Sequence, residues 1–461
     1  MKKLLDTFWA AFRGDEHDFT KGSINLAIFM LAVPAVLEMS LEALFAITDV
    51  AFVSRVGTEA VATVGLTESV LTIVYSIAWG FSTAASAIVS RRIGEQNPEA
   101  ASHAAGQVIL ISLALAAIIG IPGFIFAEDI LRIMGADDSL IAHGLNYTRI
   151  MFASSPAIIL LYTLSGVLRG AGNASYAMRS LGIANGTNIL LDPFFIFGLL
   201  AFPVLGVVGA AVATSTGRTL GVLYQLRKMT DGDMAIKVEN RHLLPDWTLI
   251  KQFVELASGA TVQFIIQSAS WIFLTRILSS FGSEVVAGYT IAIRIIIFTI
   301  LPAWGLANAA AALVGQNLGA KQPERAATSA WRAAFLNMVF LLVVSIVFAI
   351  FAPQIISSLT DQPRVIEEGV LCLRIICAGY LFFAYGMVLG QAFNGAGDTL
   401  TPTIINLVAF WAIEIPLAYY LAKTLNWGPQ GVYWSVAISE SLLALMAVVV
   451  FRRGKWKLKV V

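Results

Sequence analysis

The chain contains 461 residues, of which 58% are hydrophobic and only 13% are charged, and its formal net charge is +1. Its mean hydropathy of +0.79 excludes an ordinary soluble domain, in which charged residues make up about a quarter of the chain. The near-neutral charge also argues against a nucleic-acid partner. Apolar stretches long enough to cross a bilayer recur from end to end, so we expect an all-α integral membrane protein without a soluble domain.

The predicted elements begin with residues 1–23, which lack an apolar region of signal-peptide length and are expected to form a cytoplasmic lead-in. Spans one to six would then form an N-lobe over residues 24–228, and a polar cytoplasmic linker would follow over 229–247. Spans seven to twelve would form a C-lobe over 248–452, and 453–461 would be a basic cytoplasmic tail. The apolar runs between charged residues, Gly and Pro predict twelve spans that begin near residues 24, 61, 104, 140, 176, 205, 248, 284, 327, 365, 401 and 430.

Lysine and arginine are distributed unevenly between the loops of these spans. With the N-terminus inside, the basic residues that fall on the cytoplasmic side are Arg91, Arg92, Arg169, Arg179, Arg227, Lys228, Lys237, Arg241, Lys321, Arg325 and Arg332. The opposite loops hold few basic residues, and the segment 127–138 is acidic. The positive-inside rule therefore predicts a multi-pass protein of the cell membrane with both termini in the cytoplasm. We expect the basic tail to contact anionic lipid headgroups.

The two halves of the chain resemble each other at an offset of 225 residues. VGTEAVATVGL at 56–66 matches FGSEVVAGYTI at 281–291, and AWGFSTAASAIVSRRIGEQNPEAA at 78–101 matches AWGLANAAAALVGQNLGAKQPERA at 303–326. Six spans per copy is an even number, so the copies have the same orientation and are related by a pseudo-twofold axis along the membrane normal. Such a duplication is typical of transporters with a cavity between the halves, and a duplicated anchor or enzyme scaffold is the alternative.

Charged residues differ between the two halves. At the offset of 225, Asp49 faces Leu274, Glu38 faces Gln263, Glu42 faces Gln267 and Glu68 faces Ile293, while matching Pro193 to Pro416 places Asp192 opposite Ile415. The comparison therefore predicts that the N-terminal half carries the membrane carboxylates. At about 100° per residue, Glu38, Glu42 and Asp49 share one narrow helical stripe. We expect this stripe to line a wet cavity, where the carboxylates can titrate or hold a cation. The alternative is pairing with Arg149, Arg218, Arg294 or Arg374.

Two prolines stand near these carboxylates and predict helix bends. Pro34 lies four residues before Glu38, and Pro193 follows Asp192 directly. Because proline frees a backbone carbonyl, a carboxylate beside it is a plausible site for a proton or Na⁺. Asn188 stands one helical turn before Asp192 and could share its hydrogen bond or its ion. Prolines that serve only as architecture are the alternative.

Several other side chains are candidates for the cavity between the halves. Aromatic and amide residues that could contact aromatic or cationic ligands are Tyr75, Trp79, Gln263, Gln267, Trp271, Trp304 and Tyr385. Arg218 and Glu440 occupy matching places in spans six and twelve and could pair across the pseudo-twofold axis. Cys372 and Cys377 are expected to be core residues, so neither a disulfide nor a metal site is predicted. The sequence has no phosphate-cradling loop, and no enzymatic activity is expected.

Taken together, these motifs resemble the multidrug and toxic compound extrusion (MATE) family over nearly the whole chain. The residues that carry the resemblance are Pro34 and Asp49, the VGTEAVA and GEQNPEAA segments after them, RGAGN at 169–173, and Asn188, Asp192 and Pro193 followed by GVVGAAVAT. The resemblance implies a fold of two six-helix bundles that alternates between outward-open and inward-open V shapes. It also implies export of amphipathic, often cationic compounds by antiport against H⁺ or Na⁺, with no cofactor besides the coupling ion.

The DinF-like branch of this family implies an ion site in the N-lobe. Its first-span Asp and its Asn/Asp pair in the fifth span correspond here to Asp49, Asn188 and Asp192, and the GAAVAT match makes Thr214 the counterpart of its sixth-span Thr. The NorM-like branch adds a Glu in span seven and an Asp in span ten. Span ten has no Asp between Leu371 and Asn394, so the resemblance favours the N-lobe site over a cation site in the C-lobe.

Two other functions remain open from the sequence. A flippase for lipids or lipid-linked oligosaccharides shares the same broad fold, and it would be expected to have a larger, arginine-rich cavity. An ion channel or membrane-embedded sensor would not require two pseudosymmetric halves. For the transporter we expect small amphipathic or cationic drug-like substrates and membrane lipids as the partners of a monomer.

Overall fold

A computed structural model describes residues 2–14, 17–232 and 234–459. Six positions of the predicted lead-in, linker and tail lie outside the described residues, namely 1, 15, 16, 233, 460 and 461. Within the described ranges every regular element is a helix. The predicted all-α class is confirmed.

The N-lobe contains six spans, which follow a short amphipathic helix α1 (Lys2–Arg13). The fourth span is broken at Ser154 into two helices that are bent by 43°. The helices of the lobe are α2 (Ile24–Val53), α3 (Thr58–Gly94), α4 (Pro98–Ile125), the short α5 (Ala127–Ile133), the broken pair α6 (Asp138–Ala153) and α7 (Ser155–Gly170), α8 (Ala174–Phe197), the short η1 (Leu199–Ala201) and α9 (Val207–Asp231).

The C-lobe repeats this order after the linker helix η2 (Asn240–Leu243). Its broken span bends by 58° at Gly379, and π-helical turns interrupt its eleventh span. The helices are α10 (Trp247–Ser279), α11 (Ser283–Gly319), α12 (Pro323–Ser357), the broken pair α13 (Pro363–Ala378) and α14 (Tyr380–Gly395), then α15 (Leu400–Asn406), η3 (Leu407–Glu414), α16 (Ile415–Tyr419), η4 (Tyr420–Thr424), α17 (Pro429–Arg452) and the tail turn η5 (Lys455–Leu458).

Not all twelve spans are equally apolar. In the described part of the chain eight helices are long and apolar enough to cross a membrane, or ten when each bent pair counts as one span. α8 and α9 fall below this level because α8 buries Asn185, Asn188 and Asp192, and α9 is rich in Gly, Ser and Thr. Both helices still belong to the N-lobe bundle, where they pack along each other. The two least apolar spans are therefore the ones whose polar residues face the protein interior.

The duplication seen in the sequence recurs in the helix boundaries. α3 and α11 begin and end 225 residues apart, and so do α6 and α13, and α7 and α14. Close backbone contacts recur as well: a Cβ on Gly94 would clash with the backbone of Gln316, and a Cβ on Gly319 would clash with the backbone of Arg91. Since Arg91 and Gln316 are also 225 residues apart, the contact is the same on both sides, as a twofold axis requires. The predicted pseudo-twofold arrangement of two six-helix bundles is confirmed.

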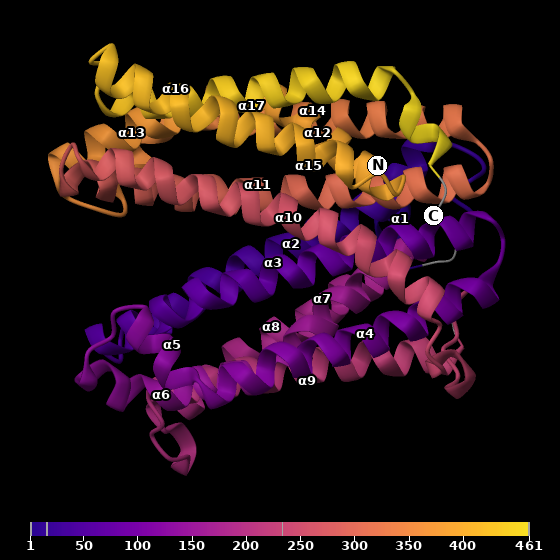
Figure 1. The fold of residues 1–461 in the computed structure, drawn as a ribbon, viewed down its shortest axis with the longest axis horizontal. Helices are drawn as coiled ribbons and strands as arrows, with labels where there is room; N and C mark the ends of the chain where they lie inside the picture. The colour runs from indigo at the N-terminus through magenta and orange to yellow at the C-terminus, as the bar shows by residue number, and fades with distance from the viewer. Residues whose placement is uncertain (1, 15–16, 233, 460–461) are drawn as a thin grey trace.

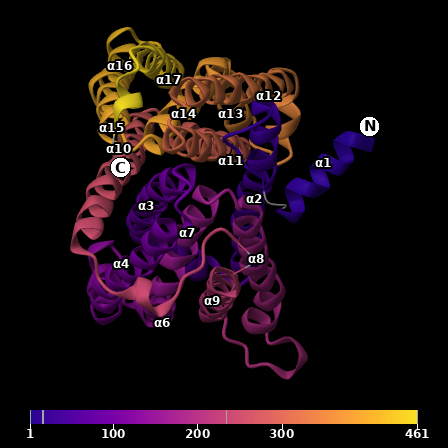
Figure 2. The same cartoon turned by 90° about the vertical axis from the view of Figure 1, so that its right-hand side faces the viewer.

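The two lobes form a V (Figure 1). They diverge toward the end where α5, α6 and α13 lie, and they meet at the end that holds both chain termini. α10 runs beside α3 from one lobe toward the other, and α1 projects from the side of the bundle (Figure 2). The lobes also exchange helix halves, because Ile28 and Leu31 of α2 pack in the C-lobe core while Phe253 and Ala257 of α10 pack in the N-lobe core.

Polar contacts reinforce the end where the lobes meet, which we call the closed end. The Arg91 guanidinium donates to the backbone carbonyl of Ala396 at 3.3 Å and to that of Lys459 at 2.7 Å. In the symmetric position, the Gln316 amide donates to the carbonyl of Gly170 at 2.9 Å. Each lobe thus donates a hydrogen bond to the backbone at the end of the broken span of the other lobe.

Candidate functional site

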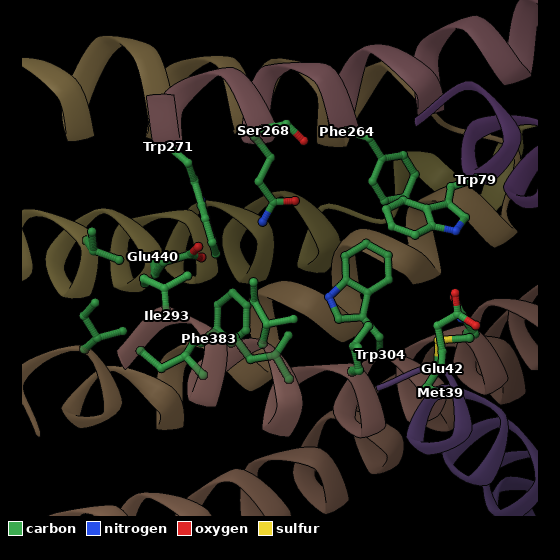
Figure 3. Close-up of a pocket in the computed structure, with 18 of the residues that line it drawn as sticks. Met39, Glu42, Trp79, Phe264, Ser268, Trp271, Ile293, Trp304, Phe383 and Glu440 are labelled. Atoms are coloured by element: carbon green, nitrogen blue, oxygen red, sulfur yellow. The ribbon is translucent and has the colours of Figure 1, made fainter. Parts of the chain in front are cut away.

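A cavity of about 530 Å³ lies between the two lobes (Figure 3). Its volume is within the range of about 300–1,000 Å³ that is typical of small-molecule sites. Both lobes contribute to the lining, with Glu42 and Trp79 from the N-lobe and Gln267, Trp271 and Trp304 from the C-lobe. All five were predicted cavity residues, and the structure brings them together around one space.

Aromatic rings form the middle of this cavity. The ring centroids of Trp79 and Phe264 are 5.6 Å apart, and those of Phe264 and Trp304 are 5.4 Å apart. The ring of Tyr162 meets Trp79 edge-on at 6.2 Å. Figure 3 shows Glu42 and Glu440 toward opposite ends of the labelled side chains, with Trp304 between them. The cavity therefore offers stacking surfaces in its centre and carboxylates toward both ends.

Three predicted cavity residues lie elsewhere. The hydroxyl of Tyr75 accepts a hydrogen bond of 2.9 Å from Arg218 inside the N-lobe. Tyr385 packs against Trp331 at a centroid distance of 6.3 Å. Gln263 donates to the Asn394 side chain at 3.1 Å and lines a small neighbouring pocket of about 60 Å³. The structure corrects these expectations because helix rotation, which residue type alone does not reveal, decides where a ring or an amide points.

A polar cluster lies inside the N-lobe, between α8 and α9. The Asn188 side-chain amide donates to the Thr214 hydroxyl at 2.9 Å and to the Asp192 carboxylate at 3.4 Å. Asp192 is fully buried and Asn188 is 1% exposed. Among the described residues, the second oxygen of Asp192 and the amide oxygen of Asn188 have no hydrogen-bond partner. The three residues therefore leave two buried oxygens that a cation or a proton can satisfy.

Asp49 on α2 completes this cluster electrostatically. Its charge acts on Asp192, and the charge of Arg218 acts on it in turn. One Asp49 oxygen is also buried without a partner in the described ranges. Glu68 on α3 interacts with the same Arg218 and with Asp49, and it stays inside the N-lobe. The expected pairing of Arg218 with Glu440 is wrong, since the guanidinium turns to Tyr75 and these N-lobe carboxylates.

The stripe predicted from Glu38, Glu42 and Asp49 splits into three environments. Glu38 is 2% exposed and forms an ion pair of 2.5 Å with Arg169 of α7. Glu42 lines the cavity and accepts from the Tyr162 hydroxyl at 2.6 Å. Asp49 lies in the N-lobe cluster. Glu38 therefore pairs with an arginine, as in the alternative to a cavity-facing stripe. Its partner is Arg169, which the sequence analysis assigned to the cytoplasmic side.

The expectation that only the N-terminal half carries membrane carboxylates is wrong. Glu414 and Glu440 of the C-lobe both line the cavity. The sequence alignment placed Ile415 opposite Asp192, but the π-helical segment η3 ends at Glu414 and shifts the register of the eleventh span. Matching Pro193 to Pro416 in the sequence could not reveal that shift. The sequence did contain one indication of a C-lobe carboxylate, because Glu414 stands in an apolar span one residue before Ile415.

The predicted prolines lie within continuous helices. α2 runs through Pro34 and α8 runs through Pro193 without a break in the helix. Next to Pro34, the backbone at Ala35 and Val36 leaves room only for a glycine at position 305 of α11. The two broken spans bend by 43° at Ser154 and by 58° at Gly379.

Two pseudosymmetric helical lobes around a central cavity define a membrane transporter. A sequence profile of the MatE family matches residues 34–194 and, a second time, residues 260–420. The two matches cover more than half of the chain and mirror its duplication. The chain therefore belongs to the MatE family of transporters and is a multi-pass membrane protein, not an enzyme.

Similar proteins match this chain over nearly its whole length. The probable multidrug resistance protein YoeA of Bacillus subtilis is 27% identical over 446 residues, which are 95% of this chain and 96% of that protein. The probable multidrug resistance protein NorM of Thermotoga maritima is 26% identical and covers 95% of this chain and 94% of its own length. A solved outward-facing structure of a multidrug resistance MATE family transporter matches with a TM-score of 0.89 at 26% identity, covering 96% of this chain and 98% of that one.

Proposed function

We propose that this protein is a secondary active multidrug exporter. It exchanges amphipathic or cationic small molecules for H⁺ or Na⁺ by alternating access, in the cell membrane and with both termini in the cytoplasm. The names of YoeA and NorM as probable multidrug resistance proteins support this substrate class. A coupling ion is the only cofactor it requires.

The observation that carries the proposal is the cavity between two pseudosymmetric lobes that meet at one end only. In duplicated transporters, one half rocks against the other around a site near the midplane. With the predicted orientation, the closed end is cytoplasmic and the V opens to the outside. Rocking about the closed end would then expose the cavity to the cytoplasm.

Ion coupling is assigned to Asp192 and Asp49, with Asn188 and Thr214 as supporting ligands. Two carboxylates that each have a buried oxygen without a partner among the described residues favour capture of a proton or Na⁺. Such capture can drive transport only by binding one conformation better than the other. In this mechanism, neutralising the cluster rearranges α2 and α8 and lowers the affinity of the cavity for the substrate. The substrate leaves outward as the ion enters.

The cavity lining favours cationic cargo over the pyrophosphate of a lipid-linked substrate. Its described lining contains the carboxylates Glu42, Glu414 and Glu440, and one arginine, Arg169. That arginine is already paired with Glu38. An anionic headgroup would find no unpaired cation among these lining residues, so the flippase alternative receives no support from the cavity.

The test is uphill transport by the purified protein in liposomes. An imposed pH or Na⁺ gradient should concentrate ethidium against its own gradient, and Asp192→Asn should reduce this uphill transport at least tenfold, because its side chain can no longer switch between a charged and a neutral form. Asp129→Asn, the same change at an exposed position of α5, should transport like the wild type. Sustained uphill transport by Asp192→Asn would refute the assignment. Imposing each ion gradient alone identifies the coupling ion.

A further inference from the structure

Two carboxylates of the C-lobe lie in the cavity wall outside the proposed coupling site. Glu414 is 1% exposed, and one of its oxygens accepts a hydrogen bond of 2.7 Å from the Ser439 hydroxyl. Its other oxygen is buried and has no hydrogen-bond partner in the part of the chain that the structure describes. Glu440 follows Ser439 on α17 and likewise has one buried oxygen without a partner. Both side chains line the central cavity.

The lobes carry opposite charges at matching places. Glu440 occupies in the twelfth span the place that Arg218 occupies in the sixth. In the N-lobe, Arg218 compensates Asp49 and Glu68, and Arg169 compensates Glu38. Within the described ranges, neither Glu414 nor Glu440 forms an ion pair, and the charge that acts on Glu440 is that of Glu414. The C-lobe pair therefore lacks the internal cation that its N-lobe counterpart has.

An ionised carboxylate at membrane depth is costly, so the group takes up a proton or pairs with a positive charge. The space beside this pair is too large for a metal ion alone, and its walls are aromatic. Trp271, Tyr380 and Phe383 line the cavity, and Figure 3 shows Trp271 and Phe383 near Glu440. Rings around a carboxylate are the surroundings that an organic cation prefers, because the ring faces attract positive charge as well.

We propose that Glu414 and Glu440 form a subsite that binds the positively charged group of an organic cation in the C-lobe half of the cavity. Ser439 is a positioning residue that holds the Glu414 carboxylate toward the cavity. The inference rests on the proposed export function and deepens it. It assigns charge recognition of the cargo to the C-lobe and leaves ion coupling to Asp49 and Asp192. The cargo and the coupling ion then use different carboxylates and compete through the conformation of the protein.

The test compares two ligands of similar shape that differ in charge. Tetraphenylphosphonium is a permanent monocation, and triphenylphosphine oxide is neutral. Isothermal titration of the full-length protein in detergent should show tighter binding of the cation. The double variant Glu414→Gln/Glu440→Gln should weaken cation binding at least tenfold and change binding of the neutral ligand less than threefold. Glu367→Gln, the same change at an exposed position of the C-lobe, should bind both ligands like the wild type.

Each result decides the proposal. Binding of the neutral ligand by the double variant shows that the cavity is intact, so selective loss of the cation supports the subsite. Unchanged cation binding, equal loss of both ligands, or a wild type without preference for the cation overturns it. Uphill transport by the wild-type protein, measured beside cation binding, separates this proposal from the proposed function. If the wild-type protein binds the cation through Glu440 but does not transport it uphill, the proposed export function is refuted and the proposed subsite is supported.

Discussion

At the scale of single residues, the Arg169–Glu38 ion pair is expected to be sensitive to substitution. Both groups are removed from water, with 12% and 3% of their side chains exposed, and Arg169 also donates to Ser82 at 2.9 Å. Removing one partner of a buried pair leaves an uncompensated charge, which costs about 3–5 kcal/mol. We expect Arg169→Ala to lower the melting temperature of the detergent-purified protein clearly.

A second variant shows whether the charge or the packing is responsible. Arg169→Met combined with Glu38→Gln removes both charges and keeps most of the side-chain volume, so it should recover most of the lost stability. The melting curve of each variant, followed by circular dichroism, provides the comparison. An Arg169→Ala protein that melts with the wild type would show that the pair contributes no stability.

The residue scale also shows what the sequence could reveal about the site. Asp49, Asn188 and Asp192 were predicted as site residues because their types are unusual in a membrane span, and the family pattern that they match added Thr214. Helical spacing within α8 predicted the hydrogen bond between Asn188 and Asp192, whereas the hydrogen bond from Asn188 to Thr214 of α9 could be seen only in the fold. Tyr385 was misplaced because an aromatic residue in a span can face lipid, core or cavity with the same sequence signal.

At the scale of elements, Asp246 holds the start of α10. Its carboxylate accepts from the backbone N–H groups of Thr248 at 3.0 Å and Leu249 at 3.2 Å, and it lies 3.3 Å from His103 of α4. The Leu249 backbone hydrogen bond is the main reason why the pKa of Asp246 lies below its usual range. Since the folded-state pKa is lowered, this stabilisation is present above the ordinary Asp pKa of about 4 and is lost as the pH falls through the lowered value.

We therefore expect Asp246→Ala to destabilise the protein by about 1 kcal/mol at neutral pH, the typical cost of losing a helix cap. Asp246→Asn keeps a capping oxygen and should retain most of the stability at pH 7. The measurement is the melting temperature between pH 3 and pH 7, where the difference between wild type and Asp246→Ala should shrink as the pH falls. A difference that stays constant over this range would contradict the electrostatic part of the argument.

Most elements could be predicted from the sequence, and the exceptions have physical causes. All predicted span starts lie within six residues of a helix start, the largest difference being residue 104 against Pro98. The break at Gly379 was missed because apolar residues flank this single glycine, whereas the Ser-Ser-Pro run at 154–156 marks the break at Ser154 and was overlooked. The π-helical turns of the eleventh span were missed because no residue pattern marks them. Because of that omission, the sequence analysis did not predict that Glu414 lines the cavity.

At the scale of the whole molecule, the duplication was visible in the sequence, but the exchange between the lobes was not. The sequence divides the chain at the linker, whereas the cores show the first halves of α2 and α10 packed against the opposite lobe. An offset between two sequence segments reports that they are alike and says nothing about which copy each contacts. The closed end adds to this exchange the symmetric glycine contacts between α3 and α11.

Those glycine contacts predict how the conformation can be shifted. Gly94 and Gly319 lie where added Cβ atoms would clash with the backbone of Gln316 and Arg91 in the opposite lobe. Overpacking at such a site costs about 1–3 kcal/mol, which shifts a two-state equilibrium by a factor of about 5 or more at each position. We therefore expect Gly94→Ala/Gly319→Ala to open the closed end and draw the diverging ends of the lobes together.

Spin labels at Thr58 and Ser283, the first residues of α3 and α11, report this motion far from the substitutions. Measured by pulsed electron paramagnetic resonance with Cys372 and Cys377 replaced by serine, the distance distribution of the double variant should move toward shorter values. Gly65→Ala/Gly390→Ala is the matched control, because an added Cβ at either position meets nothing within 4 Å. If the Gly94/Gly319 variant keeps the wild-type distribution, close backbone approach is not what holds the closed end together. Rocking must then be limited by the hydrogen bonds of Arg91 and Gln316.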